Sequence, residues 1–127
     1  MLEKLLLYVE DSAPAKALAN WTLKLAKVLN ARIFVVFVIN QKKKTKNQLK
    51  NQNQEETAWA ILYEIEDDAF EANVKVSLIL EEGRPEDKLI EVLTSFELDG
   101  IIISRQSRID FSSLLGQMPK DKVIIIK

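Results

Sequence analysis

Two short polar segments, each placed directly after an apolar run, carry the side chains that could do chemistry. The first contains Glu10 and Asp11, after the apolar residues 5–9. Two neighbouring carboxylates repel a phosphate, but a metal ion placed between them and the phosphate removes this repulsion. The pair is therefore a candidate for a nucleotide or Mg²⁺ site. In the alternative, Asp11 or Ser12 only caps the helix that follows. The second segment, residues 104–108, combines serine hydroxyls with two arginines, and such side chains could bind an anion.

The sequence lacks the residues on which many catalytic sites depend. It has no histidine and no cysteine, which excludes disulfides, Cys/His zinc sites, thiol nucleophiles and Ser-His-Asp arrangements. With a net charge of −1, the chain has no overall attraction to nucleic acid or to an anionic membrane. Any chemistry must therefore use carboxylates, lysines, hydroxyls or a bound ion.

Five short apolar runs, most of them rich in β-branched residues, predict the strands that position these segments. They are residues 5–9, 33–39, 74–80, 101–103 and 123–126. Between them we expect a helix that begins near Pro14, a second from about 55 to 72, and a third that begins at Pro85. Strands that alternate with helices pair in parallel through right-handed crossovers. A chain of 127 residues should therefore form one doubly wound α/β domain.

The strand patterns also indicate which strands are central. Residues 5–9 and 33–39 are apolar without alternation, as expected for strands that are covered on both faces. Residues 74–80 partly alternate between polar and apolar side chains. We therefore expect the third strand at an edge of the sheet.

A lysine-rich segment, residues 41–54, interrupts this pattern. Its one large apolar residue, Leu49, cannot bury enough surface to offset the entropy of ordering the segment. We expect a mobile loop here, either a basic flap over an anionic ligand, a handle for nucleic acid, or a solvated insertion. Because the segment has no aromatic residues to stack on bases, we do not expect it to bind nucleic acid. Its lysines are Lys42, Lys43, Lys44, Lys46 and Lys50.

Four motifs, taken in order, resemble the universal stress protein family, UspA-like proteins. They are L-L-L-Y-V-E-D-S at residues 5–12, E-E-G-R-P at 81–85, D-G-I-I-I at 99–103 and L-L-G at 114–116. The resemblance implies an adenine nucleotide alpha hydrolase-like fold with a five-stranded parallel sheet of order 3-2-1-4-5. In such a sheet the ligand crevice lies at the carboxyl ends of strands one and four. The polar segments after those strands are therefore expected to meet.

Nucleotide-binding members of that family carry a Gly-x2-Gly-x9-Gly-Ser/Thr loop after the fourth strand. Here Ser104 and Ser107 stand at the first two glycine positions, Gly116 comes one residue early, and Gln117 replaces the hydroxyl residue. Glycines let backbone N–H groups approach a phosphate closely, so their loss weakens such a loop. The chain after Gly116 is also too short for the helix that usually follows. The candidate nucleotide-binding residues are Glu10, Asp11, Val38, Ser104, Arg105, Ser107, Gly116 and Gln117.

The resemblance implies a function in stress response or regulation. We expect a non-enzymatic, cytoplasmic protein with weak or no ATP binding, no catalytic residue and no metal ligand. One alternative is a switch that binds ATP or AMP with slow or no hydrolysis. A second is an interaction module for protein or nucleic acid that uses the lysine-rich segment.

The last predicted strand is expected to form a homodimer interface. It consists of Val123, Ile124, Ile125 and Ile126, four β-branched residues without polar alternation. In the implied order this strand lies at an edge, where unpaired backbone groups favour addition of another strand. A two-fold partner that adds its own copy is the simplest closed arrangement, and it is also found in the family that the chain resembles. In the alternative, residues 105–120 fold back over the edge.

Overall fold

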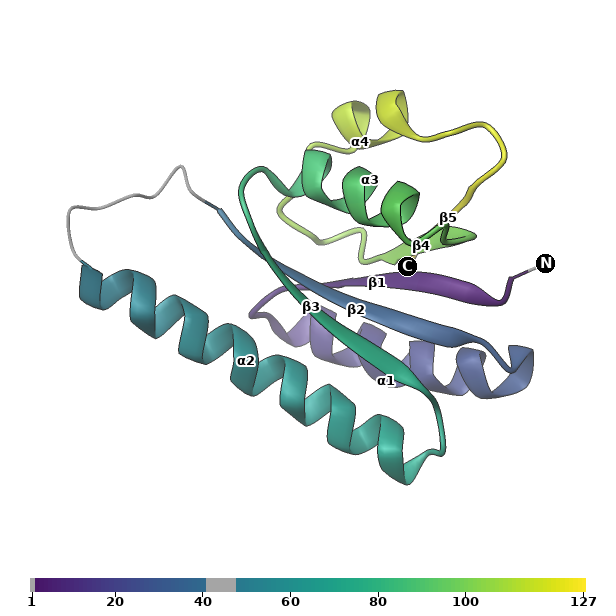
Figure 1. The fold of residues 1–127 in the computed structure, drawn as a ribbon, viewed down its shortest axis with the longest axis horizontal. Helices are drawn as coiled ribbons and strands as arrows, with labels where there is room; N and C mark the ends of the chain where they lie inside the picture. Colours follow the sequence, from purple (N-terminus) through teal and green to yellow (C-terminus); the bar gives the residue numbers. More distant parts are fainter. Residues whose placement is uncertain (1, 41–47) are drawn as a thin grey trace.

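The computed structural model describes residues 2–40 and 48–127. A five-stranded sheet of order β3-β2-β1-β4-β5 forms its centre, and every neighbouring pair is parallel (Figure 1). The strands are β1 (Lys4–Val9), β2 (Arg32–Ile39), β3 (Val76–Glu82), β4 (Gly100–Ile103) and β5 (Val123–Ile126). The predicted fold class and strand order are confirmed.

Helices cover both faces of the sheet. They are α1 (Ala13–Leu29), α2 (Gln48–Glu71), α3 (Pro85–Ser95) and α4 (Phe111–Gln117). Side chains alternate along β1, because successive residues of a strand point to opposite faces. Leu5 and Leu7 pack in a cluster with α1 and α2, whereas Leu6 and Tyr8 pack in a second cluster with α3 and α4. Burial on both faces explains why this strand is apolar throughout.

The two sheet edges differ from the centre in burial. Most side chains of β3 are only partly buried, as the predicted edge position requires. In β5, Ile124 and Ile125 are partly buried, but Val123 and Ile126 are exposed. Both edges therefore retain solvent contact within the described residues.

Two sequence predictions about helix ends need correction. α2 begins at Gln48 rather than near residue 55, so residues 48–54 belong to a helix and not to the predicted loop. This stretch contains no glycine or proline, and its Gln, Leu and Lys residues have good helix propensity, which favours the earlier helix start. Residues 41–47 of the predicted loop lie outside the described residues. Near the end of α1, Val28 lies at helical spacing from Leu18 and Trp21, which predicts a buried side chain, yet the side chain is exposed.

A short helix, α4, forms where the sequence indicated a polar loop that closes at Gly116. Its N-cap is Asp110, whose Oδ1 accepts a hydrogen bond from the Ser113 N–H at 3.1 Å. Leu114 is fully buried in the cluster with α3. The cap and the apolar contacts of Leu114 and Phe111 stabilise a helix too short for sequence periodicity to reveal.

Candidate functional site

A pocket of about 710 Å³ lies at the carboxyl ends of β1 and β2. The end of β1 contributes Glu10, Asp11 and Ser12, and β2 contributes Val38. The first half of the described α2 and Arg108, from the loop after β4, complete the wall. The volume lies within the usual range of small-molecule sites.

The polar residues that follow β1 lead directly into α1, and one of them caps this helix. The Ser12 hydroxyl accepts a hydrogen bond from the Ala15 N–H at 3.2 Å, so Ser12 is the N-cap and Asp11 is not. Asp11 is exposed at the mouth of the pocket. The capping role that the sequence left open between Asp11 and Ser12 therefore belongs to Ser12.

Glu10 connects β1 to the loop that follows β4. Its carboxylate accepts the Arg108 N–H, with 3.0 Å to Oε2 and 3.3 Å to Oε1. The Tyr8 hydroxyl donates to the same carboxylate at 3.2 Å. Burial, and then the negative charge of Glu10, raise the pKa of Tyr8 well above its ordinary value. The phenol therefore remains a protonated donor to Glu10 throughout the neutral range.

The loop after β4 uses its backbone donors within the chain. The Gln106 N–H donates to the Ser104 hydroxyl at 3.1 Å, and the Ser107 N–H donates to the Ser104 carbonyl at 3.0 Å. The Ile109 N–H donates to the Ser107 carbonyl at 3.0 Å. With the bond from Arg108 to Glu10, four consecutive N–H groups have internal acceptors. In an anion-binding loop, such groups point at the ligand instead.

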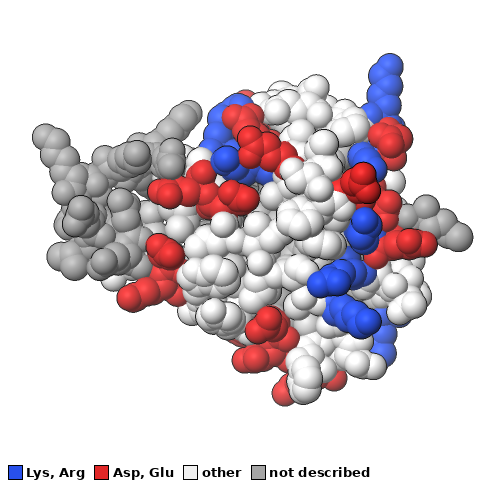
Figure 2. Space-filling view, in the orientation of Figure 1, with Lys and Arg blue, Asp and Glu red and all other residues white. Residues whose placement is uncertain are grey.

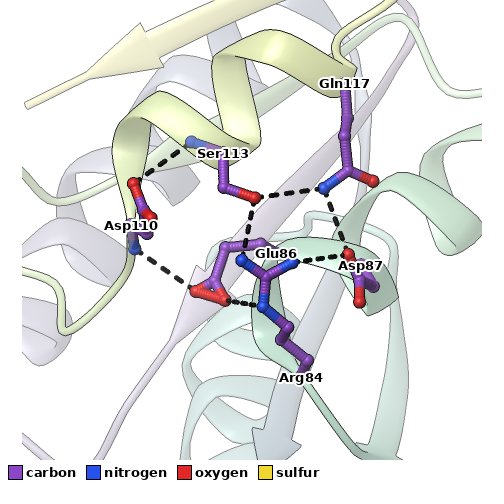
Figure 3. A network of polar contacts seen from close by, with 6 residues as sticks. All are labelled: Arg84, Glu86, Asp87, Asp110, Ser113 and Gln117. Atoms are coloured by element: carbon purple, nitrogen blue, oxygen red, sulfur yellow. Dashed lines mark hydrogen bonds and ion pairs between the residues drawn. The ribbon is translucent and has the colours of Figure 1, made fainter.

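The next backbone donor of this loop, the Asp110 N–H, belongs to a polar network between α3 and α4 (Figure 3). The Asp110 N–H donates to the carboxylate of buried Glu86 at 3.3 Å, and Glu86 pairs with the Arg84 Nε at 3.4 Å. Arg84 also donates to the Ser113 hydroxyl at 2.9 Å and to Asp87 at 3.0 Å. This network fixes α4 against the start of α3.

The structure brings only part of the predicted site together. Glu10, Asp11 and Val38 line the pocket, whereas Ser104 is buried beneath the loop and Arg105 and Ser107 are not in the pocket wall. Gly116 and Gln117 belong to α4. The Gln117 amide donates to Asp87 at 3.1 Å, in the network between the helices. The structure therefore does not bring Gly116 and Gln117 into the pocket wall with Glu10, Asp11 and Val38.

Gly116 has no conformational role that only glycine could fill. Its φ is not in the left-handed region, and a Cβ built at this position would have no neighbour within 4 Å. It lies within helix α4, where its backbone needs no special conformation.

Sequence reasoning missed several residues of the pocket wall. Asn53, Gln54 and Thr57 from α2 line it, but the first two were assigned to the lysine-rich loop. Residues 48–54 contain no glycine or proline, and this feature could have predicted that the helix begins early enough to include Asn53 and Gln54. Among the described residues, no group of three or more Asp or Glu side chains is arranged to hold a metal ion. In the same part of the chain, no helix is long and apolar enough to cross a membrane.

The parallel sheet of order 3-2-1-4-5, with a pocket at its carboxyl edge, defines a nucleotide alpha hydrolase-like α/β protein. A family model described as the universal stress protein family matches residues 1–121. The chain belongs to this family. Among proteins of curated function, none matches the sequence.

Solved structures of the family share the fold at low sequence identity. A universal stress protein family member from Burkholderia pseudomallei superposes with a TM-score of 0.81 at 15% identity, covering 99% of this chain and 96% of that one. A universal stress protein in complex with cAMP has a TM-score of 0.74 at 14% identity, covering 99% and 96%. A family protein from Arabidopsis thaliana with AMP bound has a TM-score of 0.73 at 14% identity, covering 98% and 92%.

Proposed function

We propose that this chain is a non-enzymatic universal stress protein that acts in stress response or regulation and binds ATP weakly or not at all. The observation that supports this most directly is the bond between the Glu10 carboxylate and the Arg108 N–H. This backbone N–H is a donor that a bound phosphate would need, and the Glu10 carboxylate already accepts its hydrogen bond.

Electrostatics add to this obstacle. A phosphate that approached the Arg108 N–H would have to displace Glu10, and it would then lie near the negative charges of Glu10 and Asp11. Arg108 is the one basic residue in the described pocket wall. A single exposed guanidinium does not offset two carboxylates and the loss of a charge-assisted hydrogen bond.

A nucleotide-binding switch is the second candidate function. The pocket volume of about 710 Å³ and the apolar wall at Val38 favour it, and two structural relatives hold AMP or cAMP. The two proposals differ in one measurable quantity, the affinity for nucleotide.

Isothermal titration calorimetry with Mg-ATP tests the proposal. We expect a Kd on the order of 0.1 mM or weaker, which corresponds to a binding free energy of roughly −5.5 kcal/mol or a less favourable value. A micromolar Kd would contradict it and would establish the binding switch. No phosphate release above the uncatalysed rate is expected in the same samples, because the proposal assigns no catalytic residue.

Two variants distinguish the effect of the hydrogen bond between Glu10 and the Arg108 N–H from the effect of negative charge alone. Glu10→Ala frees the Arg108 N–H and removes one charge, so ATP should bind about tenfold more tightly, equivalent to ~1.4 kcal/mol. Asp11→Ala removes one charge without freeing the donor and should improve the Kd by a smaller factor. Equal gains from both variants would show that charge alone limits binding.

A further inference from the structure

The outer edge of β3 is an unpaired strand edge in the described part of the chain (Figure 1). The Lys75 carbonyl accepts from Ile33 of β2, and the Gly83 N–H donates to Ile39 of β2. In a parallel ladder the N–H and C=O of one residue point to the same side, and successive residues alternate. The backbone groups that point away from β2 therefore belong to Val76, Leu78, Leu80 and Glu82.

In the part of the chain that the structure describes, this edge has neither lysine nor proline, two features that commonly protect strand edges. β3 has seven residues, V-S-L-I-L-E-E, and contains no proline and no lysine. Natural edge strands are commonly blocked by lysine, proline, a bulge or a covering segment. A long apolar edge without them is suited to accept another strand.

Beside this edge, α2 presents three aromatic residues in one stripe, of which Trp59 is partly buried and Tyr63 and Phe70 are exposed. Trp59 and Tyr63 stack with ring centroids 5.5 Å apart and an interplanar angle of 26°. Tyr63 is 53% exposed and Phe70 is 85% exposed. Positions 59, 63 and 70 share one face of a helix, since their spacings of four and seven residues are close to whole turns. Glu66 lies on the same face between them.

The stripe lies on the side of α2 that is away from α1. Glu64, on the other side of α2, forms an ion pair with Lys16 of α1 at 2.6 Å. In the sheet, α1 packs over β1 and β2, and α2 packs over β2 and β3. The side of α2 opposite α1 therefore borders the open edge of β3. Trp59 packs partly against the same core cluster as Leu78 and Leu80 of β3.

The charge of this surface identifies the kind of partner. Residues 55–71 of α2 contain no basic side chain. Glu55 and Glu56 lie beside Trp59 and Tyr63, and Glu66 lies on the stripe itself. Glu81 and Glu82 add two more acidic side chains at the end of β3. In Figure 2 acidic and uncharged side chains cover α2, whereas basic side chains gather on other parts of this face. Arg32 is bound to Ser77 and packs over the Phe34 ring, on the face of the sheet away from α2.

We propose that the open edge of β3 and the aromatic stripe of α2 together form a docking site for a basic, extended peptide segment of a partner protein. The segment adds as a strand beside β3 and pairs with the outward backbone groups of Leu78 and Leu80. Its Lys or Arg side chains lie over Tyr63 and Trp59, where the aromatic faces attract cations, and near Glu66. A second copy of this chain is a poorer occupant, because two acidic surfaces would then face each other.

A labelled peptide of alternating lysine and valine, seven residues long to match β3, tests the proposal. We expect a Kd of about 0.1 mM at low ionic strength by fluorescence polarisation, and weaker binding as salt is added. The same peptide with glutamate in place of lysine should not bind measurably. Equal binding of the two peptides would overturn the charge argument and the proposal with it.

Amide hydrogen exchange, followed by NMR, tests strand addition at single residues. Saturating peptide should slow exchange of the Leu78 and Leu80 amides about tenfold or more, because they gain acceptors. The Ser77 and Ile79 amides, which already face β2, should not change. Unchanged exchange at Leu78 and Leu80 would exclude strand addition. Slower exchange with rising protein concentration and no peptide would assign the edge to a second copy instead.

Two exposed positions test the stripe without disturbing the core. Tyr63→Ala and Glu66→Lys should each weaken peptide binding about two- to fivefold. Glu71→Lys makes the same charge change on another side of α2 and is the matched control, with an expected change below about twofold. If Tyr63→Ala and Glu66→Lys bind as the unaltered protein does, the stripe is not the site.

Discussion

Glu10 and Arg108 show how a small local contact changes what a pocket can bind. They are 98 residues apart in the sequence, yet the carboxylate accepts the backbone N–H of Arg108 at 3.0 Å. A charge-assisted bond of this type is stronger than a neutral one. The pocket at the carboxyl edge of the sheet thus has a carboxylate of the chain itself bound to the neighbouring loop.

The glycines of this chain have different structural roles. Gly100 is tightly packed, because a Cβ there would lie 2.5 Å from the Val123 carbonyl oxygen. Gly83 has a φ of +143°, which side chains rarely adopt. Gly116, the remaining glycine of the family's loop motif, has neither constraint.

Gly116→Ala should therefore stabilise the protein. Alanine is favoured over glycine inside a helix by about 0.5–1 kcal/mol, and the added methyl meets no neighbour. Thermal and urea unfolding measure the change. Gly100→Ala is the contrasting variant and should destabilise by about 1–3 kcal/mol, because backbone atoms must shift. A loss of stability in Gly116→Ala would show that this position has a constraint that the helix does not reveal.

Two helices, α1 and α4, begin with a side-chain cap in the segments that follow β1 and β4. Ser12 caps α1 and Asp110 caps α4. Both caps lie in segments that follow strands at the carboxyl edge of the sheet. The same segments contain Glu10, Asp11 and Arg108, so the helix starts also position the pocket residues.

Ser12→Ala should cost about 1 kcal/mol of unfolding free energy, because the Ala15 N–H loses its acceptor. Asp11→Ala is the control at the neighbouring position. It removes a charge near the helix start but no cap, so its effect should stay within about 0.5 kcal/mol. Urea denaturation of the two variants gives both values. If Asp11→Ala lowered the unfolding free energy more than Ser12→Ala does, Asp11 and not Ser12 would be the cap.

The whole molecule is a sheet with two open edges of different character. The β3 edge lies beside an acidic, aromatic helix surface, and the β5 edge carries exposed Val123 and Ile126. Leu114 of α4 packs in the core cluster with α3 and Phe111 packs against it. We propose that the β5 edge forms a homodimer by antiparallel pairing with a second copy, since backbone groups there have no neighbouring strand in the described chain.

Ile126→Lys should convert the dimer to a monomer. Ile126 is 45% exposed, so a lysine there places charge in the interface without entering the core. Ile125 is a less suitable position, because it packs against the core cluster that includes α1 and α2. Sedimentation at tens of micromolar protein measures the association state. If the unaltered protein is already a monomer at that concentration, the strand-five interface is wrong.

The sequence by itself located the five strands and three of the four helices in the described part of the chain, though not α4 or the start of α2. Apolar runs such as residues 5–9 and 101–103 identify central strands because burial on two faces requires continuous apolar side chains. Pro85 and its acidic neighbours locate the start of α3 because the missing N–H and the helix dipole are both local properties. These signals need only a few adjacent residues. With the family resemblance, they were sufficient for the fold.

Only the tertiary structure decided what the loop after β4 does. The acceptors of its N–H groups include Glu10 and Glu86, which are 98 and 24 residues away. The helix α4 depends on Leu114 reaching the cluster with α3. No local pattern encodes such partners, because hydrogen bonds and packing depend on distances that exist only after the chain has folded. The role of a polar residue in a loop is therefore decided by the neighbours that the fold brings to it.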